Sequence, residues 1–258
     1  MKLLCAALVC SALPMMAAQP FTGTWKVDVS SAKWSGKPTE VELANGTYKC
    51  LSCTTPYTVK ADGKDQAVTG QPGFDTMSAR IIDDNSVEFI QKKAGKIVSQ
   101  SKYTVSADGA TFTSEATAYP ASSDKPITAT VTANRVGKSV AGMHAYSGSW
   151  MTDKVQESDN GLLVSYEQTA DGLKMTEPSG AHFDAKLDGQ EYPVLGVPSA
   201  DAKVILEQID ANTIEMTNKN RGKIMSTARY TVSPDGRSMT VEGQTSTGVV
   251  QKFVRLKQ

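Results

Sequence analysis

The chain has 258 residues, and its 27 Lys and Arg residues balance its 27 Asp and Glu residues, so the formal net charge at pH 7 is zero. This balance provides no electrostatic attraction for nucleic acid or anionic membranes, and binding to either is not expected. Only two histidines, His144 and His182, are present. The chain consists of two sequence repeats, described below, and neither histidine recurs at the equivalent position of the other repeat. A histidine-based catalytic triad or histidine-rich metal site is therefore not expected, and no cofactor is predicted.

Residues 1–18 have the pattern of an export signal. Lys2 precedes an apolar run from Leu3 to Leu13, and the small residues Ala17 and Ala18 mark the expected cleavage site. A membrane anchor is the alternative, but the apolar run is well short of the ~20 residues that a spanning helix needs. We therefore expect an exported protein, periplasmic or extracellular, with no later transmembrane segment.

The remaining chain is a tandem repeat. Residues 103–109, YTVSADG, recur as YTVSPDG at residues 230–236, an offset of 127. Near the start of each copy, residues 23–25 match residues 148–150 at an offset of 125. We interpret residues 19–136 as the first repeat, 137–145 as a linker and 146–258 as the second repeat. Each copy has about the commonest size of an independent domain.

Each repeat opens with a segment that alternates like a β-strand, residues 21–29 in the first copy, with a tryptophan two residues after a glycine. We expect these tryptophans, Trp25 and Trp150, to plug one end of a β core. Short alternating segments follow, separated by turns such as Asn45-Gly46. The pattern predicts eight or nine short strands per repeat and no amphipathic helix.

The longest predicted strand, residues 96–106, shows how its two faces divide. Tyr103 and Ser101 share the face that we expect to point inward, and Tyr230 and Ala228 hold the same positions in the second repeat. Small side chains in the middle of this face allow two interpretations. Either the interior holds a modest cavity, or the strands curve and pack closely there. The sequence alone does not distinguish these two interpretations.

Two cysteines, Cys50 and Cys53, lie outside the signal. Three states are open: a disulfide, a redox-active pair or a metal site. A low thiol pKa is favoured at a helix N-terminus, whereas these residues follow a strand pattern and precede Pro56. A structural zinc site would need two further ligands. An exported chain meets oxidising conditions, so the pattern predicts a disulfide between Cys50 and Cys53.

A search for catalytic groups finds carboxylates and lysines that recur in both copies. These pairs are Asp75 with Asp201, Glu88 with Glu215 and Lys96 with Lys223. Recurring carboxylates could support acid–base chemistry, but each member lies in a different repeat. We interpret them as strand-surface and turn residues and predict no enzymatic activity, no catalytic residue and no metal ligand.

The aromatic-x-Gly-x-Trp opening segment, the Asx-Gly turns and the YTVSADG repeat resemble the lipocalin and calycin group of β-barrels. More specifically, they resemble an uncharacterised family of exported bacterial lipocalin-like proteins. The resemblance covers nearly the whole chain after the signal. It implies two tandem antiparallel up-and-down β-barrels, and an arginine of each last strand, Arg135 and Arg255, stacked on a tryptophan of an opening strand.

Two functions follow from this pattern. The first is binding of a small apolar or amphipathic ligand, in the barrels or between them, with Tyr103, Ser101, Tyr230 and Ala228 lining the interior. The second is a solid-cored structural or interaction protein of the cell envelope that takes no ligand. A cavity larger than roughly 300 Å³ lined by those residues would favour the first. A filled interior with an exposed apolar patch would favour the second. The protein partner in the second case is not predicted.

Overall fold

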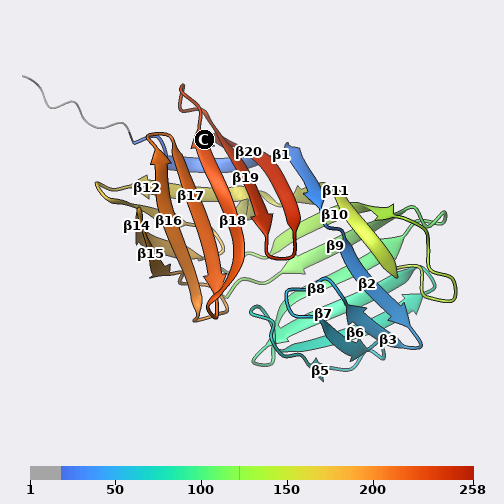
Figure 1. The fold of residues 1–258 in the computed structure, drawn as a ribbon. Coiled ribbons are helices and arrows are strands. Elements are labelled where there is room, and N and C mark those ends of the chain that lie inside the picture. The colour runs from blue at the N-terminus through green and yellow to red at the C-terminus, as the bar shows by residue number, and fades with distance from the viewer. Residues whose placement is uncertain (1–18, 122) are drawn as a thin grey trace, which may run out of the picture.

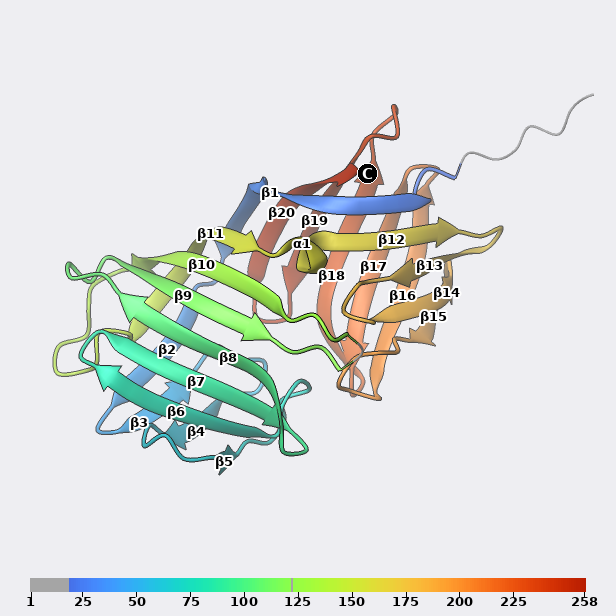
Figure 2. The same cartoon turned by 180° about the vertical axis from the view of Figure 1, so that it is seen from behind.

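The computed structural model describes residues 19–121 and 123–258, so the predicted signal at residues 1–18 lies outside the described residues. The described residues form two ten-stranded antiparallel sheets and one short helix, α1 (Asp159–Leu162). Each sheet curls into a nearly closed barrel (Figures 1 and 2). The predicted all-β tandem fold is therefore confirmed, with slightly more strands in each barrel than the eight or nine expected.

One sheet, here called the first barrel, contains mainly strands of the first repeat. In spatial order its strands are β4 (Tyr57–Lys60), β3 (Thr47–Cys50), β2 (Thr39–Ala44), β11 (Gly148–Glu157), β10 (Ile127–Val136), β9 (Thr111–Ala118), β8 (Lys96–Val105), β7 (Ser86–Lys93), β6 (Thr76–Asp83) and β5 (Gln66–Ala67).

The other sheet, the second barrel, contains mainly strands of the second repeat. Its order is β14 (His182–Lys186), β13 (Gly172–Thr176), β12 (Leu163–Gln168), β1 (Gly23–Gly36), β20 (Val249–Lys257), β19 (Ser238–Thr245), β18 (Lys223–Val232), β17 (Thr213–Asn220), β16 (Ala202–Asp210) and β15 (Asp188–Pro193).

The two repeats exchange their opening strands. β1 leaves the first repeat and lies between β12 and β20, while β11 of the second repeat lies between β2 and β10. Figures 1 and 2 show β1, in blue, against the red β20 of the second barrel. The predicted boundaries follow the repeat in the sequence, whereas each barrel in space takes nine strands from one repeat and one from the other.

β1 bends as it runs along β20. Its register shifts between Asp28 and Lys33. There the Asp28 carboxylate accepts hydrogen bonds from the backbone and the hydroxyl of Ser30, at 3.0 and 2.6 Å. The Ser31 hydroxyl replaces a lost ladder partner by accepting from the Val254 amide at 2.8 Å. Such an irregularity disrupts the ladder locally and bends the strand, and here the Asp28 and Ser31 side chains accept the Ser30 and Val254 amides.

Tight hairpins fix the register of the longest strands. The β7–β8 turn places Ala94 and Gly95 at φ values of 49° and 77°, and the β17–β18 turn repeats this with Arg221 and Gly222 at 49° and 73°. Positive φ at both central residues is typical of the two-residue turn whose twist matches a β-hairpin. The two repeats therefore present matching hairpin tips.

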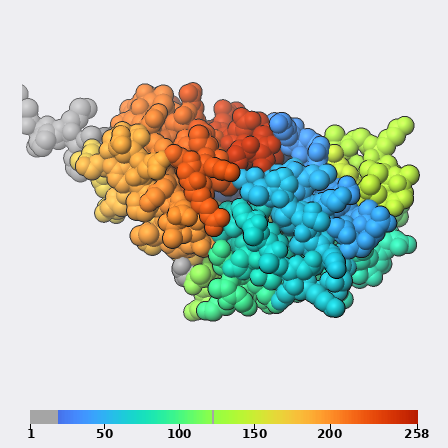
Figure 3. All heavy atoms as spheres, turned by 60° about the horizontal axis from the view of Figure 1, so that its bottom comes forward, coloured from blue at the N-terminus to red at the C-terminus, as the bar shows by residue number. Residues whose placement is uncertain are grey.

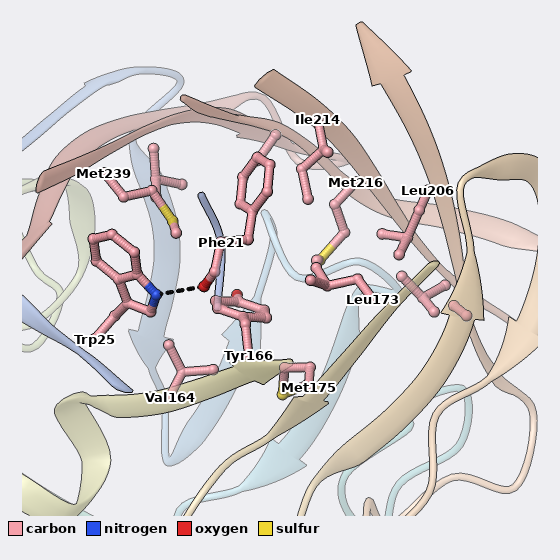
Figure 4. Packing of buried hydrophobic residues seen from close by; sticks show 14 of the residues in the cluster. Phe21, Trp25, Val164, Tyr166, Leu173, Met175, Leu206, Ile214, Met216 and Met239 are labelled. Atoms are coloured by element: carbon pink, nitrogen blue, oxygen red, sulfur yellow. Dashed lines mark hydrogen bonds between the residues drawn. The ribbon is translucent and has the colours of Figure 1, made fainter. Parts of the chain in front are cut away.

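Each barrel has its own core. In the second barrel, Phe21 and Trp25 of the first repeat pack with residues of β12, β13, β16, β17 and β19. Figure 4 shows the Trp25 indole donating a hydrogen bond to the Phe21 carbonyl at 2.8 Å. In the first barrel, Tyr146 and Trp150 occupy the matching place, with the same bond at 2.9 Å. Both tryptophans are almost fully buried, each inside the barrel of the other repeat.

Candidate functional site

Cations lie against both opening-strand tryptophans. The Arg135 guanidinium is 4.0 Å from the ring centre of Trp150, and the Lys257 ammonium is 5.2 Å from that of Trp25. In the sheet register Arg135 pairs with Trp150 and Lys257 pairs with Trp25. Lys257 therefore holds in the second barrel the position of Arg135, and Arg255, expected on a tryptophan, lies two residues before it.

Aromatic rings fill the first barrel. Tyr103 contacts Phe89, Phe112 and Tyr146 at ring-centre distances of 5.5, 5.4 and 4.9 Å. Phe112 continues the cluster to Trp150 at 4.9 Å. Tyr103 thus points inward as the strand pattern predicted, but it belongs to a packed aromatic cluster. For this part of the interior, the close-packing interpretation describes the structure better than an open cavity.

The tyrosine hydroxyls of this cluster are shielded from water. Burial raises the pKa of Tyr48 and of Tyr146 well above the ordinary value, and it raises the pKa of Tyr57 to about 12. Burial also raises the pKa of Tyr103, an effect that the neighbouring Ser101 and Tyr146 side chains partly offset. These groups remain neutral at physiological pH and act as dipoles in an apolar interior.

The interior of the second barrel is different because it contains a charge. Arg255 lies against the rings of Phe253, Tyr230 and Tyr166, with its guanidinium carbon 5.6, 5.7 and 6.0 Å from their centres. One terminal nitrogen donates to the Tyr166 hydroxyl at 2.8 Å. Among the described residues, the buried Arg255 Nε has no hydrogen-bond partner, and neither has the buried side-chain oxygen of Gln168.

Register identifies what the first barrel has at these positions. In the second barrel Arg255 pairs with Met239, and in the first barrel Ala133 pairs with Phe112. Met239 and Phe112 are equivalent residues of the two repeats, so Arg255 is equivalent to Ala133. Tyr166 pairs with Gly23 as Val41 pairs with Gly148. The arginine and tyrosine thus replace a buried alanine and a buried valine. No pattern in the sequence indicates this pair, because the sequence alone aligns Arg255 with Arg135.

A cleft of about 680 Å³ lies between the barrels. Most of its lining is apolar. From the first barrel come Phe74, Ile97, Ala118, Tyr119 and Pro120, and from the second come Ala181, Val197 and Pro198. Lys93, Lys96 and Glu177 add charges to its wall. Ile97 and Tyr119 are exposed to 44% and 39%, so apolar surface here faces solvent.

A second cleft has a volume of about 780 Å³ and is lined by segments equivalent to those of the first cleft, with the two repeats interchanged. The β17–β18 tip with Ile224 and the loop at Ser246 face the Cys50–Cys53 disulfide loop of the first barrel. In the first cleft the β7–β8 tip with Ile97 faces the loop at Ser179, which matches the disulfide loop in the second repeat. Figure 3 shows the orange second barrel against the cyan and blue first barrel. Fewer apolar residues line this second cleft.

The other predicted site residues occupy separate places. Ala228 is buried in the second barrel, and Ser101 lies in β8 beside Tyr103. The four proposed ligand-binding residues are thus divided between two barrels. The disulfide between Cys50 and Cys53 is present, and it borders the second cleft.

The recurring acidic residues form ion pairs on the surface. Glu88 pairs with Arg80 at 2.7 Å and Glu215 with Arg229 at 3.0 Å. Asp75 and Asp201 lie 4.0 and 3.6 Å from the basic side chains of Lys93 and Arg221. These are surface ion pairs, each of which contributes little stability.

The two histidines interact mainly with backbone groups. The His144 Nε2 lies 2.7 Å from the Asp83 carbonyl, and its Nδ1 accepts the Tyr146 amide at 3.1 Å. His182 lies at the start of β14, where its backbone pairs with Leu195 near the open edge of the second barrel. The two side chains are therefore located in different barrels.

No protein-family model and no curated protein matches this chain. Within the part of the chain that the structure describes, no helix has the length and apolar character needed to cross a membrane. The barrels and the clefts between them are therefore the features from which a function can be inferred.

Proposed function

We propose that this chain is an exported, non-enzymatic binding protein for a small amphipathic ligand, and that the 680 Å³ cleft between the barrels is where the ligand enters and binds. The cleft itself is the observation that supports this proposal. Its volume falls within the roughly 300–1,000 Å³ typical of small-molecule sites, and its lining is mainly apolar with a few polar groups, as such sites are.

The composition of the cleft supports an amphipathic ligand over a wholly apolar one. Ile97, Tyr119 and Val197 provide apolar surface, while Lys93, Lys96 and Glu177 provide charges at its wall. Exposed apolar side chains on both walls lose contact with water when a ligand binds, which contributes about 25 cal/mol per Å² of buried apolar surface. The charged groups fix the polar end of the ligand.

Export and a place in the exported bacterial lipocalin-like family are part of the same proposal. The Cys50–Cys53 disulfide supports export, because such bonds persist in oxidising compartments. Two barrel-like sheets in tandem support the lipocalin-like assignment. The fold is also compatible with ligand binding, although barrels of this kind carry many functions.

Titration with the neutral fluorescent probe N-phenyl-1-naphthylamine tests the cleft. We expect saturable binding with enhanced emission. Val197→Asp introduces a carboxylate into the apolar wall and should weaken binding at least about tenfold, or about 1.4 kcal/mol. Val140→Asp is the matched control, because Val140 is an exposed linker valine outside the cleft and its variant should bind like the wild type.

Two results would contradict the proposal. If neither the probe nor medium-chain alcohols bind saturably, the cleft takes no small ligand. If both aspartate variants bind the probe as the wild type does, the site is elsewhere. In the first case the alternative leads: an interaction protein of the cell envelope that contacts its partner through exposed apolar residues such as Ile224, which is 55% exposed.

A further inference from the structure

The Cys50–Cys53 disulfide has one accessible sulfur and one enclosed sulfur. Cys50 ends β3, is 4% exposed and belongs to the core cluster of the first barrel. Cys53 follows in the next loop and lines the second cleft, which Cys50 does not. Exchange at a disulfide requires a thiolate to reach one of its sulfurs. A small thiol in the second cleft can therefore reach the Cys53 sulfur but not the Cys50 sulfur.

The loop that carries Cys53 has attachments other than the disulfide. The backbone amides of Leu51 and Ser52 donate to the Glu40 carbonyl at 3.0 and 3.3 Å. The Glu40 amide in turn donates to the Ser52 hydroxyl at 2.8 Å. Because these hydrogen bonds join the loop to β2, we expect opening of the disulfide to be a local event that leaves the first barrel folded.

The second barrel shows that the fold does not require the bond. Cys50 pairs with Val41, and Met175 pairs with Tyr166 at the equivalent place in the second barrel. Met175 is buried like Cys50, and the second repeat contains no cysteine. This barrel still forms the connection between β13 and β14. A structural role common to both barrels therefore does not explain the disulfide.

The lining of the second cleft favours an anion. Lys37 and Lys223 contribute two positive charges and Glu40 contributes one negative charge, so the lining has a net charge of +1 (2 − 1). A cleft with an excess of one sign of charge raises the local concentration of ions of the opposite sign. The attacking form of a thiol is itself an anion, the thiolate. The cleft therefore favours a thiol that carries a further negative charge.

We propose that the Cys50–Cys53 disulfide is a thiol-exchange site, attacked at Cys53 by a small anionic thiol that enters through the second cleft. The thiolate sulfur forms a bond to the Cys53 sulfur while the bond between Cys53 and Cys50 breaks. The electron pair of that bond leaves on Cys50 as a thiolate, which takes a proton from water. The product is a mixed disulfide on Cys53, and attack of the Cys50 thiolate on it expels the small thiol and restores the original bond.

The attacking nucleophile comes from outside the chain. Neither cysteine therefore needs the lowered thiol pKa that a helix N-terminus provides, and the strand-and-loop setting of this pair is compatible with exchange. The site is separate from the ligand cleft of the proposed function and does not depend on it.

Reaction of the folded protein with two small thiols at low ionic strength tests the proposal. The anionic probe is 2-mercaptoethanesulfonate and the neutral probe is 2-mercaptoethanol, each at the same thiolate concentration. Acid quenching and peptide mass spectrometry identify the sulfur that carries the mixed disulfide. We expect it on Cys53, with the anionic probe reacting at least about threefold faster and with added salt reducing this difference. The β-sheet circular dichroism should not change.

Variants locate the charge effect and the attacked sulfur. The double variant Lys37→Gln with Lys223→Gln should lose the preference for the anionic probe. Lys64→Gln is the matched control, because Lys64 is an exposed lysine outside the cleft, and it should keep the preference. The thiol that remains in Cys50→Ser should react with the disulfide of the anionic probe at least about tenfold faster than the thiol that remains in Cys53→Ser, since access limits exchange.

Four results would overturn the proposal. The disulfide resists both probes while the protein is folded, or the mixed disulfide forms on Cys50. The two probes react equally fast with the wild type, or the double lysine variant keeps the preference. Loss of the β-sheet signal when the bond opens would show that the disulfide is structural. Binding of N-phenyl-1-naphthylamine in the first cleft is measured separately, so failure of the exchange site leaves the proposed function in place.

Discussion

The guanidinium of Arg135 lies 4.0 Å from the ring centre of Trp150, although the two residues belong to different sequence repeats. The same side chain donates hydrogen bonds to the carbonyls of Gly109, Ala145 and Ser147, at 2.6, 2.6 and 2.7 Å. One arginine thus connects the last strand of the first repeat, the linker and the exchanged strand. The barrels are coupled because each is completed by a strand from the other repeat.

Engineered disulfides should detect this exchange directly. Thr24 in β1 and Ser165 in β12 face each other, with their hydroxyl oxygens 2.9 Å apart. Opposed Cβ atoms of neighbouring antiparallel strands are about 4.5–5.5 Å apart, a separation that a disulfide can span with small adjustments. The double variant Thr24→Cys with Ser165→Cys should therefore cross-link under mild oxidation, as measured by mass spectrometry of peptides.

The control is the pair that would meet if the strands were not exchanged. Glu40 pairs with Ser149 of β11; without exchange, Thr24 would take that place. Thr24→Cys with Glu40→Cys should remain reduced under the same conditions, while Ser149→Cys with Glu40→Cys should cross-link. Formation of the Thr24–Glu40 cross-link, with no Thr24–Ser165 product, would contradict the exchanged arrangement.

Much of the architecture could be predicted because it depends on local patterns. Alternation predicted the strands, and turn residues such as Asn45-Gly46 marked the hairpins. The exchange of β1 and β11 could not be predicted. Trp25 and Trp150 follow the same aromatic-x-Gly-x-Trp pattern, so either strand satisfies the hydrophobic register of either barrel. Which barrel each strand enters depends on the path of the connecting segments in three dimensions, and no local pattern encodes that path.

The candidate site was predicted less completely, for a similar reason. Tyr103 and Tyr230 do point inward, since side-chain direction follows from strand alternation. From the sequence, Arg255 is expected to be the equivalent of Arg135, because both are arginines in the last strand of a repeat. The loop between the last two strands is shorter in the second repeat, which shifts the register, and Lys257 holds the matching position. Only the pairing of β20 with β1 and β19 reveals that Arg255 replaces an alanine.

Arg135→Met should destabilise the protein strongly. The variant leaves carbonyl groups without their charged donors and removes the contact with Trp150. Hydrogen bonds to charged groups contribute about 1.5–3 kcal/mol each, and part of this returns when water reaches the carbonyls. We therefore expect a loss of about 2–4 kcal/mol in the free energy of unfolding, measured by urea denaturation followed by Trp fluorescence.

Lys257→Met provides the comparison, because its cation occupies the matching place over Trp25 at 5.2 Å and the side chain is exposed. An exposed cation–π contact is worth about 0.5–1 kcal/mol, so this variant should lose no more than that. Equal losses in the two variants would show that the carbonyl contacts of Arg135 contribute nothing.

Glu157 should make the wild type less stable as the pH rises from acid. Burial, and then the negative charge of Glu177, raise its pKa above the ordinary value. A raised pKa in the folded state means that the stabilising contribution of the protonated form is fully present below the unfolded pKa of about 4.3. It is lost as the pH rises through the raised folded value. Glu157→Gln should remove this dependence and be more stable than the wild type at neutral pH.

The measurement is the difference in unfolding free energy between wild type and variant from about pH 4 to 8. Aspartates such as Asp75 and Asp108, whose pKa values are lowered by hydrogen bonds, act in the opposite direction in both proteins and cancel in this difference. A difference that stays constant across the range would contradict the assignment of Glu157.

Alkaline titration should distinguish a packed first barrel from a hydrated one. Burial raises the pKa of Tyr48 and Tyr146 well above the ordinary value and that of Tyr57 to about 12. With a raised folded pKa, the stability from these neutral hydroxyls is complete below the unfolded value of about 10 and is lost as the pH rises through the folded values. Absorbance of tyrosinate should therefore show that part of the eight tyrosines ionises only as the β-sheet circular dichroism disappears.

Tyr146→Phe introduces the residue that the second barrel has at the equivalent position, Phe21. This variant should be more stable than the wild type above about pH 10 and less stable by no more than about 1 kcal/mol at pH 7. If all the tyrosines instead ionise near pH 10 with the fold intact, water reaches the aromatic cluster, and the first barrel contains an open site that its ring packing would otherwise exclude.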